Sequence, residues 1–296
     1  MCNKIAIGHN KQKEFFQRAI QKDRISHSYI FSGISGIGKK LFAINTAKAL
    51  LCEENSFFTN CTCKSCTQID NNIHPDLHIY DGKDLKIENI RGISEYADMT
   101  AFSGKWKIFI LDEAELLSAS AQTAAGNALL KTLEEPASSC LFLLITSKYE
   151  LILPTIRSRC SLINFSPLSN HDMKNILTQH NIYSDSIIRK AHGSIEKALF
   201  LHELDMEDIT CLLKEKNYKK FTKEILSVDN KIVLQYVLEQ IYPLCLEKFK
   251  ETGRYSYCQL GDYILEIIRN IRFNVSIDLV KSDLISKSVE VFSERV

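Results

Sequence analysis

The sequence predicts an α/β fold with a parallel sheet in its first half and helices only in the remainder. Up to about residue 165, short apolar runs alternate with helical or loop-like sequence, and from there to residue 296 only helical patterns follow. A glycine-rich loop between an apolar strand and an Ala-rich helix is the third observation behind this prediction. A chain of 296 residues exceeds what one compact core usually holds, so we expect two or three domains.

The expected strands are four apolar runs separated by helical or loop-like sequence. Parallel strands need long crossover connections, and this spacing provides them. The runs are residues 28–32, 77–80, 107–111 and 141–146.

The helical part begins near residue 168. Three short helices are expected to follow Ser169, Ser184 and Ser194, because hydroxyl groups favour helix starts. Longer amphipathic helices are expected at residues 218–227, 230–250, 257–272 and 277–294, with a kink at Pro243 in the second. The predicted domains are therefore 1–167, 168–205 and 206–296.

The loop after the first strand has the pattern of a phosphate-binding loop. Gly33, Gly36 and Gly38 let backbone N–H groups turn toward an anion, the following helix points its positive end at it, and Lys39 adds an ammonium group. Lys40 stands where such a loop carries the Ser or Thr that contacts Mg²⁺, and a protonated lysine has no lone pair to give. ATP or ADP binding with poor metal-assisted hydrolysis is expected; a glycine-rich turn without a ligand is the alternative.

Carboxylates and hydroxyls follow two of the later strands. Asp112 and Glu113 end the strand at 107–111, as in a Walker B motif, where Asp112 would hold hydrated Mg²⁺ and Glu113 would polarise the attacking water. An acidic strand end that caps the next helix is the alternative. Thr146 and Ser147 end the next strand and would lie close to a γ-phosphate.

Arg159 lies in a Ser158-Arg159-Cys160 segment that the chain's own nucleotide site explains poorly. An arginine finger stabilises charge on a transferring phosphoryl group, often from a neighbouring subunit. The alternative is an ordinary solvated surface arginine.

Taken with the Lys131-Thr132-Leu133-Glu134-Glu135-Pro136 segment, these motifs resemble the AAA+ subunits of bacterial DNA polymerase III clamp loaders over roughly residues 5–200. The resemblance implies an AAA+ P-loop module, a small helical lid domain and a C-terminal all-α collar bundle. It also implies a hetero-oligomeric ring with ATPase and delta subunits that acts on a sliding clamp and primed DNA, with Arg159 serving the ATP of an adjacent subunit.

Two kinds of subunit in this family compete. The delta-prime subunits are more similar in His74-Pro75-Asp76 and in residues 153–160, whereas gamma/tau, the ATPase subunit and the alternative, ends its phosphate loop in Lys-Thr. The gamma/tau sensor arginine is replaced here by Glu196, whose carboxylate would repel a triphosphate. We therefore expect weak or no ATPase activity, and no set of carboxylates indicates a polymerase. A small kinase with a zinc lid is a further alternative, although it would leave residues 131–136 and Arg159 unexplained.

Four cysteines resemble the zinc module of the same family, inserted at residues 52–66. Four thiolates close a tetrahedral structural site. Loosely packed reduced thiols are the alternative, because only one residue separates Cys61 and Cys63. The expected ligands are Cys52, Cys61, Cys63 and Cys66. The N-terminus has no signal-peptide pattern and no run reaches 18 apolar residues, so we expect a cytoplasmic protein.

Overall fold

The computed structural model describes residues 5–54, 56–102, 106–118, 123–136, 139–203, 209–228, 231–270 and 276–293. The chain divides into two compact units, residues 1–203 and 204–296. The predicted boundary at residues 205 and 206 lies outside the described residues. The first unit contains both the sheet and the three short helices after residue 168. Their separation into two domains stays a prediction.

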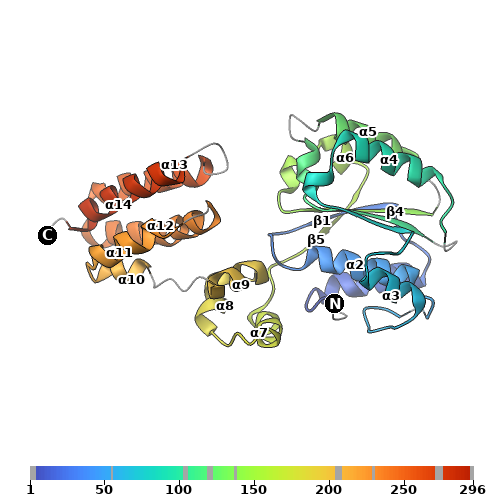
Figure 1. Cartoon of the computed structure of the whole chain (residues 1–296), viewed down its shortest axis with the longest axis horizontal. Helices are drawn as coiled ribbons and strands as arrows, with labels where there is room; N and C mark the ends of the chain where they lie inside the picture. The colour runs from blue at the N-terminus through green and yellow to red at the C-terminus, as the bar shows by residue number, and fades with distance from the viewer. Residues whose placement is uncertain are drawn as a thin grey trace. The chain divides into compact units, whose positions relative to one another are not determined.

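The first unit is built on a parallel sheet (Figure 1). Its five strands follow the order β2-β3-β4-β1-β5. The strands are β1 (Ser28–Ser32), β2 (Leu77–Tyr80), β3 (Lys107–Leu111), β4 (Cys140–Thr146) and β5 (Ser161–Asn164). The four predicted strands are confirmed within one residue. Sequence reasoning missed β5, an edge strand whose residues are mostly exposed and therefore form no apolar run.

Helices cover both faces of this sheet (Figure 1). One face carries α1 (Asn10–Gln21), α2 (Lys39–Leu51) and α3 (Lys64–Asp70), and the other carries α4 (Ile87–Asp98), α5 (Thr123–Glu134) and α6 (Pro154–Arg157). Single 3₁₀ turns at Gly82–Asp84, Ala114–Ser118 and Tyr149–Leu151 follow β2, β3 and β4. The sheet is therefore covered by helices on both faces, as a parallel sheet with crossover helices requires.

Aromatic side chains fill both interfaces of the sheet. On the α4 and α5 side, Phe109 and Phe142 of neighbouring strands stack with ring centroids 4.9 Å apart. Between the sheet and α1 and α2, Phe31 packs against Phe16 and Phe42. These rings are fully buried, so the two hydrophobic interfaces hold the strand ends in a fixed arrangement.

Three short helices complete the first unit: α7 (Asn170–Gln179), α8 (Asp185–Ala191) and α9 (Ile195–Glu203). The predicted caps are confirmed for all three helices. The Ser169, Ser184 and Ser194 hydroxyls accept hydrogen bonds from the backbone N–H groups three residues later, those of Asp172, Ile187 and Lys197.

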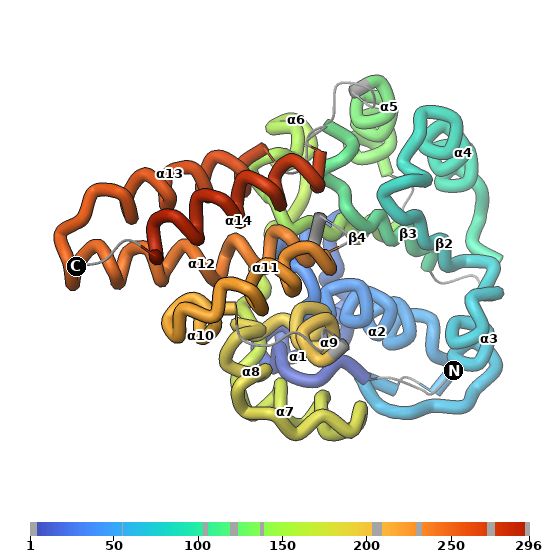
Figure 2. The backbone as a smooth tube through the Cα atoms, turned by 60° about the vertical axis from the view of Figure 1, so that its left-hand side comes forward, coloured from blue at the N-terminus to red at the C-terminus, as the bar shows by residue number. Residues whose placement is uncertain are grey.

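All secondary structure in the described part of the second unit is helical. It contains α10 (Ile209–Lys214), α11 (Tyr218–Leu226), α12 (Lys231–Thr252), α13 (Tyr255–Asn270) and α14 (Ile277–Ser293). Helices α12, α13 and α14 lie side by side (Figure 2). The last four helices are confirmed within two residues at each end. Pro243 lies inside α12 as expected, and the kink there stays a prediction. Sequence reasoning missed α10. In the described parts of the chain, no helix combines the length and apolarity needed to cross a membrane.

Candidate functional site

The predicted phosphate loop lies between β1 and α2, at the carboxyl edge of the sheet. Gly36 and Gly38 have φ angles of 75° and 90°, a left-handed backbone that residues with a side chain rarely adopt. Gly38 is also the residue before α2, so the loop leads straight into the positive end of that helix. The structure therefore places Gly33, Gly36, Gly38 and Lys39 in the strand–loop–helix arrangement that binds phosphate. Their nucleotide-binding role stays a prediction.

Lys39 is turned back onto its own loop. Its Nζ donates to the carbonyl oxygens of Gly33 and Ile34, each at 2.7 Å. The residue is 6% exposed, and burial lowers the pKa of its ammonium group. An ammonium group held by loop carbonyls has to exchange these partners before it can bind a phosphate.

Lys40 occupies the position at which a phosphate-binding loop carries the Ser or Thr that contacts Mg²⁺. Its Nζ contacts a carboxylate oxygen of Asp81 and lies 3.4 Å from Oδ2 of Asp112. Burial alone would lower the pKa of Lys40, but the hydrogen bond to Asp81 and the charge of Asp112 raise it above its usual value. A protonated amine between these two carboxylates offers no ligand to Mg²⁺ and repels it, so the residues present do not fit the metal of an active P-loop site.

Asp112, Glu113 and Thr146 also lie at this edge, as the sequence predicts from their positions after β3 and within β4. Burial, with the negative charges of Asp112, Glu115 and Asp81, raises the pKa of Glu113. Thr146 is buried next to Ser32 of β1, and its hydroxyl accepts a hydrogen bond of 2.9 Å from the Lys148 backbone N–H. The proposed roles of all three in nucleotide chemistry stay predictions.

The start of α9 closes over the phosphate loop. The Ile195 backbone N–H donates to the Gly36 carbonyl at 2.8 Å, and the Ser35 hydroxyl donates to Oε2 of Glu196 at 2.8 Å. A Cβ atom on Gly36 would lie 2.3 Å from the Ser194 hydroxyl oxygen, so the two segments are in direct contact. The carboxylate of Glu196 therefore stands beside the loop, where it disfavours a bound triphosphate.

Arg159 lies at the opposite end of the sheet from this loop. The Ser28 hydroxyl at the start of β1 donates to the Arg159 carbonyl at 2.7 Å, whereas the loop begins after Ser32. With a rise of about 3.3 Å per residue, the two ends of β1 are about 13 Å apart. The Arg159 side chain is 32% exposed, and its guanidinium group binds Oε1 of Glu134, the last residue of α5. Arg159 is thus directed away from the chain's own phosphate loop.

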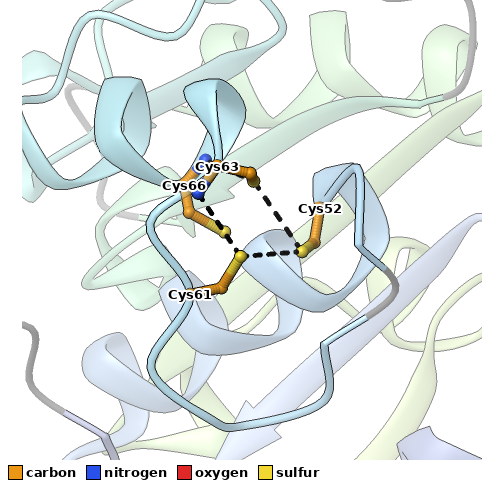
Figure 3. A group of neighbouring side chains, drawn as sticks. All are labelled: Cys52, Cys61, Cys63 and Cys66. Atoms are coloured by element: carbon orange, nitrogen blue, oxygen red, sulfur yellow. Dashed lines mark hydrogen bonds between the residues drawn. The ribbon is translucent and has the colours of Figure 1, made fainter.

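The four predicted zinc ligands come together between α2 and α3 (Figure 3). Their sulfur atoms all lie within 4.8 Å of one another, with Cys52 3.6 Å from Cys61 and 3.9 Å from Cys63. A tetrahedral zinc ion with Zn–S bonds of about 2.3 Å places its sulfur ligands about 3.8 Å apart. The donor set and its spacing therefore fit zinc, and the single residue between Cys61 and Cys63 does not prevent convergence.

Sequence reasoning missed two residues of these sites. Asp81 follows β2 directly, so the rule that parallel strands end at one edge would have found it. Glu134 lies in the motif at residues 131–136, but its pairing with Arg159 depends on how α5 packs beside α6, which no local pattern reveals.

The fold and the site define a P-loop module of the AAA+ type in which Lys40 stands at the loop position of the usual Ser or Thr. A sequence profile described as DNA polymerase III, delta subunit, matches residues 8–169. The chain therefore belongs to the DNA polymerase III delta subunit family, which confirms the clamp-loader resemblance and argues against the small-kinase alternative.

Individual relatives agree with this assignment. The chain is 34% identical over 166 residues to DNA polymerase III subunit delta′ of Bacillus subtilis, covering 55% of this chain and 49% of that protein. It is 29% identical over 238 residues to subunit tau of the same organism, covering 80% of this chain and 41% of that protein. The chain thus spans about half the length of these relatives or less.

A solved structure supports the fold alone. A DNA polymerase III gamma subunit-related protein from Thermotoga maritima superposes with a TM-score of 0.55 at 17% identity, covering 95% of this chain and 99% of that chain.

Proposed function

We propose that this chain is a delta-prime-like subunit of a DNA polymerase III clamp loader that lends Arg159 to ATP bound by a neighbouring ATPase subunit. The position of Arg159 carries this proposal: it lies at the amino end of β1, away from the chain's own phosphate loop, and its side chain is 32% exposed. An arginine there is well placed to meet a triphosphate only if another protein brings it.

The chain's own loop contributes little or no hydrolysis in this proposal. Lys39 is bound to loop carbonyls, Lys40 takes the metal position between Asp81 and Asp112, and Glu196 adds negative charge beside the loop. Each feature opposes the binding of a Mg²⁺-bound triphosphate: Lys39 is not free to bind phosphate, Lys40 repels the metal, and Glu196 repels the negative charge of the phosphates. We also assign the chain no polymerase activity.

The proposed partners are the ATPase and delta subunits of a hetero-oligomeric ring. The helical second unit would form part of a collar, and the first unit would act near primed DNA, contacting the sliding clamp only indirectly. The delta′ relative supports this assignment. As a part of the replication machinery, the protein would work in the cytoplasm.

A gamma/tau-like subunit with its own ATPase activity is the second candidate. It is favoured by the longer similarity to a tau subunit and by the presence of Asp112 and Glu113 after β3. The ion pair between Lys40 and Asp112 opposes it, because the carboxylate that would hold Mg²⁺ is already paired.

We further propose that the four-cysteine cluster holds a structural zinc ion. With four thiolates around it, the metal has no open position for catalysis, and it would tie the segment at 52–66 to the end of α2.

The experiment is ATP turnover by the ring reconstituted with its cognate subunits, clamp and primed DNA. Arginine fingers contribute about 10³ to 10⁵ in rate, so Arg159→Ala should nearly abolish ATP hydrolysis at the site it serves. Turnover by the whole ring should fall by more than about threefold even if the other ATP sites remain active. Arg157→Ala is the matched control, because Arg157 lies two residues away and pairs with Glu150 instead. A smaller loss than this with Arg159→Ala, from a correctly assembled ring, would overturn the proposed function.

A further inference from the structure

We propose that Glu134 is a positioning residue that holds the Arg159 side chain in the orientation needed to contact a triphosphate. This inference rests on the proposed function of Arg159. The guanidinium group donates three hydrogen bonds to neighbouring residues. Its Nη1 donates to the Thr155 carbonyl at 2.8 Å and to the Ser158 hydroxyl at 3.3 Å, and its Nη2 donates to Oε1 of Glu134 at 2.5 Å. Thr155 and Ser158 belong to the turn that carries Arg159, whereas Glu134 comes from a separate helix.

Hydrogen-bonding capacity remains for a phosphate. An arginine side chain has five N–H donors, and the contacts within the described part of the chain use three of them. The Nε–H and the second Nη2–H are left to bind phosphate oxygens. Glu134 can therefore keep its hold on Nη2 while the guanidinium group contacts a triphosphate on another protein.

Stability of α5 does not explain a glutamate at this position. Glu134 is the last residue of α5, where the negative end of the helix disfavours a carboxylate. Its side chain is 48% exposed and that of Arg159 is 32% exposed, so the pair contributes little to folding. The replacement of Glu134 should consequently leave the protein folded.

The contact with Glu134 fixes the orientation of the Arg159 side chain. A long arginine side chain loses rotamer freedom when it binds a phosphate, and a side chain already held in one orientation has lost that freedom beforehand. Geometry matters strongly in phosphoryl transfer, where a misplacement of about 1 Å can cost about 100-fold in rate. The carboxylate also weakens the local positive charge, so the proposal requires that orientation outweighs this charge effect.

Two substitutions separate orientation from charge. Glu134→Ala removes the acceptor, whereas Glu134→Gln keeps an oxygen at the same reach and removes the charge. In the reconstituted ring with clamp and primed DNA, we expect Glu134→Ala to lower kcat for ATP by about tenfold with KM unchanged, and Glu134→Gln to stay within about twofold of the unmodified ring. The matched control is Glu135→Ala, the exposed neighbour in the same segment, which should have no effect.

A double-mutant cycle decides whether Glu134 acts through Arg159. Glu134→Ala should cause no further loss in a ring that already carries Arg159→Ala. The inference is overturned if Glu134→Ala leaves or raises the rate, if Glu134→Gln is as damaging as Glu134→Ala, or if Glu134→Ala still lowers the rate without Arg159. An unchanged rate for Arg159→Ala alone would instead refute the proposed function, so the two failures are distinguishable.

Discussion

The substitution Lys40→Thr tests whether the lysine replaces a metal ion. Lys40 lies 3.4 Å from Asp112 and contacts Asp81, with side-chain exposures of 39% for Lys40, 24% for Asp112 and 48% for Asp81. At an effective dielectric constant of about 20, a pair 3.4 Å apart attracts by about 5 kcal/mol, but exposed pairs retain only about 0.2–1 kcal/mol after desolvation and entropy. Loss of both pairs should therefore destabilise the first unit by about 0.4–2 kcal/mol in the absence of divalent cations.

Threonine also supplies the missing hydroxyl ligand, so Mg²⁺ should restore stability. For a dissociation constant of about 1 mM, 10 mM Mg²⁺ contributes about 1.4 kcal/mol through binding to the folded state. Urea unfolding reports this change through Trp106, the single tryptophan of the chain, which directly precedes β3. Lys40→Thr should gain stability with Mg²⁺, whereas the unmodified protein should not respond.

Lys40→Met is the matched control, because it removes the charge without adding a hydroxyl. It should lose stability as Lys40→Thr does and gain none from Mg²⁺. The reasoning is refuted if Lys40→Thr is as stable as the unmodified protein and ignores Mg²⁺, or if Mg²⁺ stabilises the unmodified protein to the same degree.

Two further predictions concern the cysteine cluster and Glu113. The purified chain should release about one zinc ion per molecule on thiol modification, as measured with a colorimetric chelator. Cys66→Ser should abolish this release, whereas Cys211→Ser, at an exposed cysteine outside the cluster, should not. A metal-free protein would contradict the assignment. Because burial and neighbouring carboxylates raise the pKa of Glu113, its ionised form opposes folding above that pKa and its protonated form does not. Glu113→Gln should thus stabilise the first unit at neutral pH in urea unfolding, with an advantage that disappears as the pH falls below the carboxyl range; a constant advantage at all pH values would count against this explanation.

Much of the fold follows from local patterns in the sequence. The strands β2 and β3 match their predicted bounds, because each is a short apolar run between polar segments. The starts of α7 and α8 were also predictable, because a Ser residue precedes each helix and caps it locally. The edge strand β5 has no buried residue, and the helix α10 has only six residues, too few to show a helical period.

The candidate sites were predictable to a different extent. The phosphate loop and the four cysteines are close in sequence, so spacing alone indicated them. The contact of Lys40 with Asp81 depends on the order of strands in the sheet, and the contact of Glu134 with Arg159 joins residues 25 positions apart. Packing of separate elements creates both contacts, which is why residue types and spacing did not reveal them.

The most direct test of the central claim compares ATP turnover by two altered rings, one with Arg159→Ala and one with Lys39→Met in this subunit. If the subunit serves a neighbour's ATP and uses none of its own, the Arg159→Ala ring should lose more than about threefold while the Lys39→Met ring stays within about twofold of the unmodified ring. A large loss with Lys39→Met and none with Arg159→Ala would contradict the account and identify this chain as an ATPase subunit.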